Sequence, residues 1–124
     1  MTDETFNPVA VDLDGLREEL AEAGVAEILW ELVETFATDA PRRMKAIDSA
    51  LQSGSSREIR TAAHAYKSAA GTMRARELAS LLLDLELAGN EADLEKALAL
   101  QAPIRDAHKR TLEFLSDAPG EGDA

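Results

Sequence analysis

The 124-residue sequence contains no cysteine, and only 4% of its residues are aromatic. The absence of cysteine excludes disulfide scaffolds, thiol nucleophiles, Cys-ligated zinc and iron–sulfur clusters. No apolar run approaches the ~20 residues that a membrane-spanning helix needs, so no membrane is expected as a partner. The length suffices for one domain with a hydrophobic core but is short for two.

Positive charge is also scarce, because 13 Lys and Arg residues face 24 Asp and Glu residues, for a formal net charge of −11. Such a chain repels phosphates at long range, which argues against a nucleic-acid binder and against a protein that lies on anionic membranes. The amino-terminal residues are acidic and lack the basic-then-apolar pattern of a secretory signal. We therefore expect a soluble, acidic protein of the cytoplasm.

Helix-forming residues dominate the composition, and the few glycines and prolines lie mostly where helices would end. Apolar residues recur at helical spacing, and no segment alternates with a period of two. Short connections between amphipathic helices favour antiparallel neighbours. The sequence therefore predicts an all-α fold, an antiparallel up-and-down four-helix bundle with an additional N-terminal helix.

The expected single domain covers residues 12–116, between a flexible lead at residues 1–11 and a disordered acidic tail at residues 117–124. Pro41 is expected either to kink one long helix or to begin a new helix after residue 39. Pro103 is expected to kink the last helical region or to divide it into two consecutive helices. The predicted helical segments are 12–24, 25–52, 55–72, 75–88 and 91–116.

Helix ends are indicated by capping residues. Ser55 and Glu58 form a capping-box pattern, in which the hydroxyl and the carboxylate each satisfy an otherwise unpaired amide. The Gly89-Asn90 pair is expected to end the preceding helix, and Asn90 is expected to cap the next one.

The most informative segment is residues 57–76, with the sequence REIRTAAHAYKSAAGTMRAR. His64 falls opposite the centre of the apolar stripe, so its side chain is expected to be exposed. The stripe itself, which is the predicted core face, consists of Ile59, Ala62, Ala63, Tyr66, Ala69, Ala70 and Met73. The outward side shared with His64 carries Arg57, Arg60, Thr61, Lys67, Ser68 and Gly71.

This outward side is basic within an acidic protein, because residues 57–76 contain five cations and one anion. Ser68 and Gly71, one and two turns after His64, are small. A glycine inside a helix costs about 0.5–1 kcal/mol relative to alanine, so a steric or functional reason is plausible. Small neighbours let another protein's surface approach the imidazole ring closely.

A neutral imidazole is a nucleophile, and an ordinary histidine pKa of about 6.5 leaves much of it unprotonated at neutral pH. Nearby Lys67 and Arg60 would favour an attached phosphoryl group through charge-assisted contacts. Phosphoryl transfer asks mainly for positioning and charge stabilisation, which a helix face provides if the partner supplies the metal. The pattern therefore favours His64 as a transient phosphoryl acceptor.

The same residues resemble the histidine phosphotransfer (HPt) domain family, over about residues 25–90. The resemblance rests on Ala63-His64-Ala65-Tyr66-Lys67 followed by Ser68, Ala69 and Ala70, on Leu78 and Leu85-Glu86, and on the upstream Phe36, Pro41, Met44, Ile47 and Ala50-Leu51. Three positions depart from the family pattern. Tyr66 stands where the family usually has Leu, and Ser68 and Arg74 each stand where it usually has Gly.

The resemblance implies a four-helix bundle that acts as a phosphorelay intermediary without kinase activity of its own. It implies His64 as the phosphoacceptor and Lys67 as its basic neighbour. The implied partners are receiver domains of response regulators and of hybrid histidine kinases. No cofactor is implied for this chain, and Mg²⁺ is expected on the receiver only.

The candidate site therefore has His64 as its phosphoacceptor, and no residue is predicted to bind a metal. The residues predicted to bind phosphate or a partner are Lys67, Ser68, Gly71, Arg60 and Arg57. A monomer is expected. The alternative function is a helical adaptor that binds a partner through the same face without phosphorylation. A hydrolytic or metal-dependent enzyme has little support, because the sequence shows no Gly-rich phosphate loop, no nucleophile–base pattern and no metal-ligand spacing.

Four residues outside this face remain. His108 falls near an apolar stripe and is predicted to be a partly buried structural histidine. Leu83 and Leu87 lie off the main stripe of their helix and are predicted to pack against the N-terminal helix, with a small dimer patch as the alternative. Trp30 is expected either at the edge of the core or on a docking surface.

Overall fold

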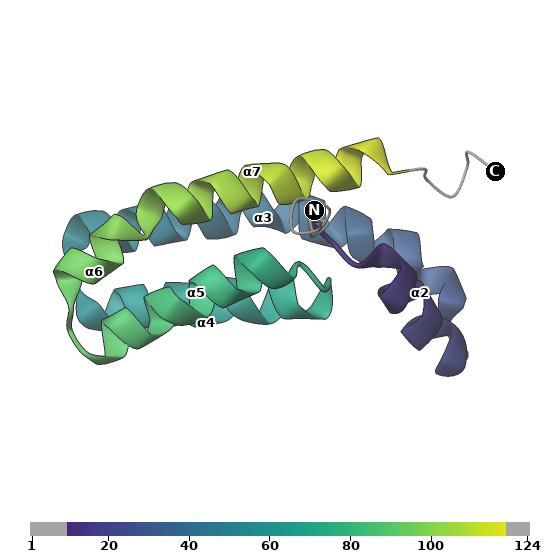
Figure 1. The fold of residues 1–124 in the computed structure, drawn as a ribbon, viewed down its shortest axis with the longest axis horizontal. Helices are drawn as coiled ribbons and strands as arrows, with labels where there is room; N and C mark the ends of the chain where they lie inside the picture. The colour runs from purple at the N-terminus through teal and green to yellow at the C-terminus, as the bar shows by residue number, and fades with distance from the viewer. Residues whose placement is uncertain (1–9, 119–124) are drawn as a thin grey trace, which may run out of the picture.

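The structure, a computed structural model, describes residues 10–118, and all regular structure within that range is helical. Four main helices form the bundle, with α2 as the additional N-terminal helix, so the predicted architecture is confirmed (Figure 1). Figure 1 shows α3 and α7 side by side, the α4–α5 hairpin along them, and α2 at the end opposite α6. The elements are α2 (Leu13–Glu22), the 3₁₀ helix η1 (Ala26–Ile28), α3 (Leu29–Ser53), α4 (Ser56–Thr72), α5 (Arg76–Asn90), α6 (Leu94–Ala99) and α7 (Gln101–Asp117).

Helix α3 passes through Pro41 as one helix of 25 residues, so the alternative of a new helix after residue 39 is wrong. Proline removes one backbone donor, but α3 buries apolar side chains on both sides of it, including Phe36 before and Met44 after. The predicted start of this helix near Val25 is also wrong, because η1 occupies residues 26–28.

The last helical region consists of two consecutive helices. Of the two predicted alternatives, a kink or a division into two helices, the second is confirmed. The break falls at Leu100, and Pro103 lies in the first turn of α7, where its missing N–H would have no partner inside the helix. Asn90 caps neither helix and is instead the last residue of α5. The cap of α6 is Asp93, whose side chain accepts a hydrogen bond from the amide of Lys96 at 3.1 Å.

Two further predictions of helix ends need correction. Gly89 does not break α5 but lies buried inside it. The capping box is half formed, since the Ser55 hydroxyl accepts from the Glu58 amide at 3.2 Å. The Glu58 carboxylate, however, accepts from the Ser53 hydroxyl at 3.0 Å, and that same hydroxyl accepts the Ser55 amide at 3.2 Å. Ser53 has therefore taken the place of glutamate as partner of the Ser55 amide.

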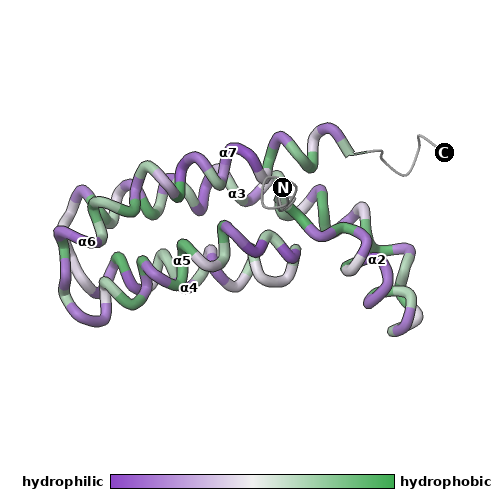
Figure 2. The backbone as a smooth tube through the Cα atoms, in the orientation of Figure 1, coloured by the Kyte–Doolittle hydropathy of each residue, from purple (hydrophilic) through white to green (hydrophobic). Residues whose placement is uncertain are grey.

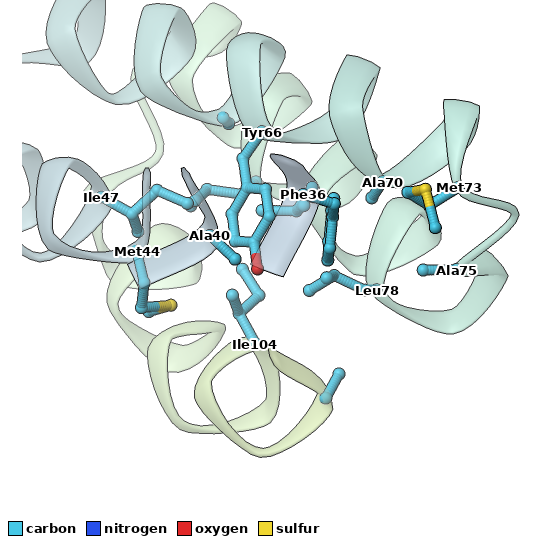
Figure 3. Close-up of a cluster of buried hydrophobic side chains, with 14 of the residues drawn as sticks. Phe36, Ala40, Met44, Ile47, Tyr66, Ala70, Met73, Ala75, Leu78 and Ile104 are labelled. Carbon is cyan, nitrogen blue, oxygen red and sulfur yellow. The ribbon is translucent and has the colours of Figure 1, made fainter. Parts of the chain in front are cut away.

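The predicted core face of α4 is confirmed, with Ala62 and Ala69 half-buried and the other members buried. Figure 2 shows apolar and polar residues alternating along each helix in the manner of amphipathic helices. Tyr66 is fully buried and extends from α4 toward Ile104 on α7, beside Phe36 (Figure 3). A tyrosine at this position therefore reaches across the whole bundle.

The Tyr66 hydroxyl forms a 2.6 Å hydrogen bond with Nδ1 of His108. His108 is half-buried, as predicted, and burial lowers its pKa, with the nearby Arg105 guanidinium acting in the same direction. Burial raises the pKa of the Tyr66 hydroxyl, so that group stays protonated. His108 is therefore a structural partner of Tyr66, remote from the outward face of α4.

The predicted packing of Leu83 and Leu87 against the N-terminal helix is wrong, because their side chains are 42% and 44% exposed. They lie on the side of α5 opposite its buried residues. The alternative, a small dimer patch, stays a prediction. Trp30 is half-buried against the core, with the Arg17 guanidinium 5.9 Å from its ring centroid. The core-edge interpretation of Trp30 is the one that the packing supports.

Helix α2 is tied to the turn between α4 and α5. Arg74 occupies that turn with a left-handed backbone (φ +59°), and its guanidinium contacts Asp12 at 3.5 Å and Glu19 at 3.1 Å. Val11, inside the predicted lead, is buried. The rest of that lead at residues 1–9, and residues 119–124 of the predicted tail, lie outside the described residues.

Candidate functional site

His64 lies in the middle of α4 and points away from the core, with its side chain 61% exposed. This exposure follows from the helical period, because the neighbouring Ala63 and Tyr66 are both buried on the opposite side. The sequence-based placement of His64 is therefore correct. Its ring lines a shallow pocket of about 390 Å³ together with Arg60, Thr61, Ala65 and Glu86.

Glu86 on α5 fixes one side of the imidazole. Its Oε2 lies 2.9 Å from Nδ1 of His64. An ionised carboxylate only accepts hydrogen bonds, so Nδ1 carries the proton in this contact. In the neutral ring the unprotonated nitrogen is then Nε2. The arrangement leaves a nucleophilic nitrogen free on an exposed side chain.

Lys67 completes a cluster of three groups, because its Nζ lies 2.7 Å from Oε1 of the same Glu86. The Lys67 ammonium is the main cause that holds the pKa of Glu86 below its usual value, and His64 adds to it, whereas burial acts in the opposite direction. Glu86 is therefore ionised at neutral pH. Glu86 belongs to the Leu85-Glu86 pair of the family resemblance, but no role was predicted for it, and its contact with His64 joins residues 22 positions apart.

The remaining candidates do not all gather at the imidazole. Arg60 lines the same pocket as His64, whereas Arg57 lines the neighbouring groove between α3 and α4. Ser68 is exposed one turn after His64. A Cβ built on Gly71 would meet no atom within 4 Å, so nothing in the described structure requires glycine there. The free space is consistent with a surface kept open for a partner.

Among residues 10–118 no group of three or more His, Asp or Glu side chains is placed to hold a metal ion. No helix in the same range is both long enough and apolar enough to cross a membrane.

The fold and this surface define a class, a helical bundle that presents one nucleophilic histidine on an outer helix face beside fixed charges. Residues 31–115 match the family model described as the Hpt domain, and the chain belongs to that family. This membership supports a phosphotransfer role in a phosphorelay, in which Hpt domains interact with receiver domains and kinases.

A solved structure gives the same result. The chain resembles histidine-containing phosphotransfer protein B (HptB) from Pseudomonas aeruginosa PAO1, with 25% sequence identity and a TM-score of 0.77. The match covers 90% of this chain and 96% of HptB. No curated protein sequence matches the chain.

Proposed function

We propose that His64 is the phosphoacceptor of this Hpt domain. The observation that carries the proposal is the contact between Nδ1 of His64 and the Glu86 carboxylate, which leaves Nε2 as the free, exposed nucleophile. The donor is an aspartyl phosphate on a receiver domain, and a second receiver takes the group onward. Such a carrier needs no kinase activity and no metal of its own, because Mg²⁺ on the receiver supplies the metal chemistry.

In the transfer step the Nε2 lone pair attacks phosphorus. The N–P bond forms while the P–O bond to the aspartate breaks, and the aspartate leaves as a carboxylate. The Nδ1 proton stays where it is, so the ring gains positive charge in the direction of Glu86. A fixed negative charge beside a developing positive charge stabilises the transition state without reorganisation.

Lys67 and Arg60 act on the phosphoryl group. Lys67 is paired with Glu86 in the unphosphorylated protein, one turn from the imidazole, and its flexible side chain reaches phosphoryl oxygens once they arrive. Arg60 lies one turn before His64 and makes no ion pair with another described residue. Charge-assisted contacts of this kind are about twice as strong as neutral hydrogen bonds.

We also propose an oligomeric state, a location and partners for the protein. It acts as a monomer in the cytoplasm, with receiver domains of response regulators and hybrid histidine kinases as its partners and with neither nucleic acid nor membranes among them. The runner-up is an adaptor that docks on the same face without phosphorylation, and the exposed small residues Ser68 and Gly71 suit that role equally well.

One experiment separates the two functions. The protein is incubated with a phosphorylated receiver domain, and the bound phosphate is tested for the acid lability and base stability of a phosphohistidine. The carrier function predicts labelling of the wild type and none of His64→Gln. Because His64 is exposed, His64→Gln should keep the helical content and the thermal midpoint of the wild type. Equal labelling of the variant would contradict the assignment, and no labelling of either protein would favour the adaptor.

A further inference from the structure

A groove of about 900 Å³ lies between the second half of α3 and the first half of α4. Four of the residues that line it are alanines, namely Ala46, Ala50, Ala62 and Ala65. Such small side chains let the backbone of another helix approach closely. Thr61 and Ala65 line both this groove and the pocket of His64, so the two surfaces are continuous. A partner that covers His64 therefore reaches the groove.

The rim of the groove is positively charged. Arg42, Arg43 and Arg57 line it, together with one carboxylate, that of Glu58, and Arg42 is paired with Asp39 at 3.1 Å. Arg43 and Arg57 make no ion pair with any residue of the range 10–118. Most other cations of the chain are paired, so this concentration of unneutralised charge is local.

Arg43 in particular lacks partners for its donors. Its Nε is buried without a hydrogen-bond partner, and its guanidinium reaches the Ala65 carbonyl only at 3.5 Å. A buried donor that is left unpaired lowers the stability of the fold, so the Arg43 side chain is not held in place by partners of its own. The amino terminus of the 17-residue helix α4 also opens on the groove and adds the positive end of its dipole.

The rest of the chain is strongly acidic, so the positive charge at this groove contrasts with its surroundings. The chain carries a net charge of −11, so an acidic partner is repelled by the molecule as a whole and attracted at this groove. The geometry points to a docking surface: we infer that the α3–α4 groove receives an acidic helix of the receiver domain that exchanges phosphoryl groups with His64. This inference rests on the proposed function, and it adds the chemistry of the partner surface. An amphipathic helix in a groove is a recurrent mode of recognition, and here acidic side chains would meet the arginine rim.

The test compares two exposed charge reversals of equal size. Arg57→Glu alters the groove, and Lys109→Glu on α7, which lies away from α4 in Figure 1, is the matched control. Transfer from a phosphorylated receiver that labels the wild type is measured as kcat/KM at low and at high salt. Arg57→Glu should lower kcat/KM at low salt by about tenfold or more and flatten its salt dependence, while Lys109→Glu should follow the wild type.

A second variant and a second donor keep the two proposals apart. Arg43→Gln keeps most of the side-chain length and removes the charge, and it should also weaken transfer from the receiver. Phosphoramidate, a small phosphodonor that needs no docking, should label His64 in Arg43→Gln at the wild-type rate. Failure of phosphoramidate and of the receiver to label the wild type would overturn the proposed function itself.

Two outcomes would overturn the inference while leaving the proposed function in place. One is a kcat/KM that is equal in wild type and Arg57→Glu at low salt. The other is self-association of the wild type in sedimentation experiments that Arg57→Glu abolishes, because the occupant would then be a second copy of this chain.

Discussion

Gly89 on α5 lies directly against the backbone of Arg60 on α4. A Cβ at Gly89 would fall 3.0 Å from the Arg60 nitrogen and 3.1 Å from the Ser56 carbonyl oxygen. Backbone atoms cannot rotate out of the way, so any side chain there must push the two helices apart. The contact lies one turn from the pair of Glu86 and His64, and it sets the helix separation at which that pair forms.

Gly89→Leu should therefore destabilise the fold and loosen the site. Overpacking of a close helix contact costs about 1–3 kcal/mol of unfolding free energy, and urea unfolding measures it. The neighbouring Asn90→Leu is the control, because Asn90 is exposed and its substitution should change the unfolding free energy by less than about 0.5 kcal/mol. Equal stability of Gly89→Leu and the wild type would show that α5 is free to shift.

Glu86→Gln tests the role of the carboxylate. The amide can donate as well as accept, so the Nδ1–H form of His64 loses its enforced preference. We expect labelling by a phosphorylated receiver to slow by about tenfold, or about 1.4 kcal/mol, which is near the strength of one charge-assisted hydrogen bond. Nitrogen-15 chemical shifts of the ring should show a mixture of tautomers. Asp84→Asn removes the same charge from the opposite side of α5 and should leave rate and shifts unchanged.

The outward face of α4 could be predicted from the sequence because helical period alone decides it. Ala63 and Tyr66 mark the buried side, and His64 between them must point outward. Glu86 could not be assigned its contact in this way. Periodicity places it beside the core of α5, but which face of α4 it meets depends on how the two helices pack, which Gly89 controls.

Helix ends were the weaker part of the prediction for a related reason. Asn90 and Asp93 are both good capping residues, and local propensity does not choose between them. Burial decides where α5 ends, because Ala88 and Gly89 pack against the bundle and the helix therefore continues to Asn90. Pro41 was ambiguous in the same sense, since the core contacts of α3 on both sides of it outweigh the lost hydrogen bond.

Tyr66→Phe should cost about 1–2 kcal/mol of unfolding free energy. The substitution keeps the ring in the core but leaves Nδ1 of His108 without its 2.6 Å partner in a half-buried site. Urea unfolding at pH 7.5 measures the loss. No change in stability would mean that water replaces the hydroxyl at no cost.

His108 also predicts a pH dependence of stability. Burial lowers the pKa of folded His108, so the unfolded chain, with a histidine pKa of about 6.5, binds the proton more readily. The contribution of neutral His108 is therefore complete above about pH 6.5 and is lost as pH falls through the lower folded pKa. Unfolding free energies at pH 7.5, 6.5 and 5.5 should decline, and His108→Gln should remove that decline. His64→Gln, which removes the other histidine, should retain it.

Two residues with left-handed backbones form a natural comparison. Ala92 (φ +56°) and Arg74 (φ +59°) both carry a side chain where glycine is free of strain. Ala92→Gly should raise the unfolding free energy, because relief of about 1–2 kcal/mol of left-handed strain exceeds the entropic cost of glycine, about 0.5–1 kcal/mol. Arg74→Gly should gain less, because it also removes the contacts to Asp12 and Glu19 that hold α2. A gain from Arg74→Gly that exceeds the gain from Ala92→Gly would mean that those contacts contribute nothing to stability.

We expect Ser68 to set the closest approach of a receiver to His64, because it is exposed one turn further along the same face. In-line transfer needs the partner's aspartate close to Nε2, and a misplacement of about 1 Å can cost on the order of a hundredfold in rate. Ser68→Gly should therefore be tolerated, whereas Ser68→Gln should block transfer from a receiver and leave the thermal midpoint unchanged. Ser80→Gln makes the same substitution at an exposed position of α5 and should transfer like the wild type. Transfer by Ser68→Gln at the wild-type rate would place the docking surface elsewhere, and the argument that Gly71 is kept small for a partner would fail with it.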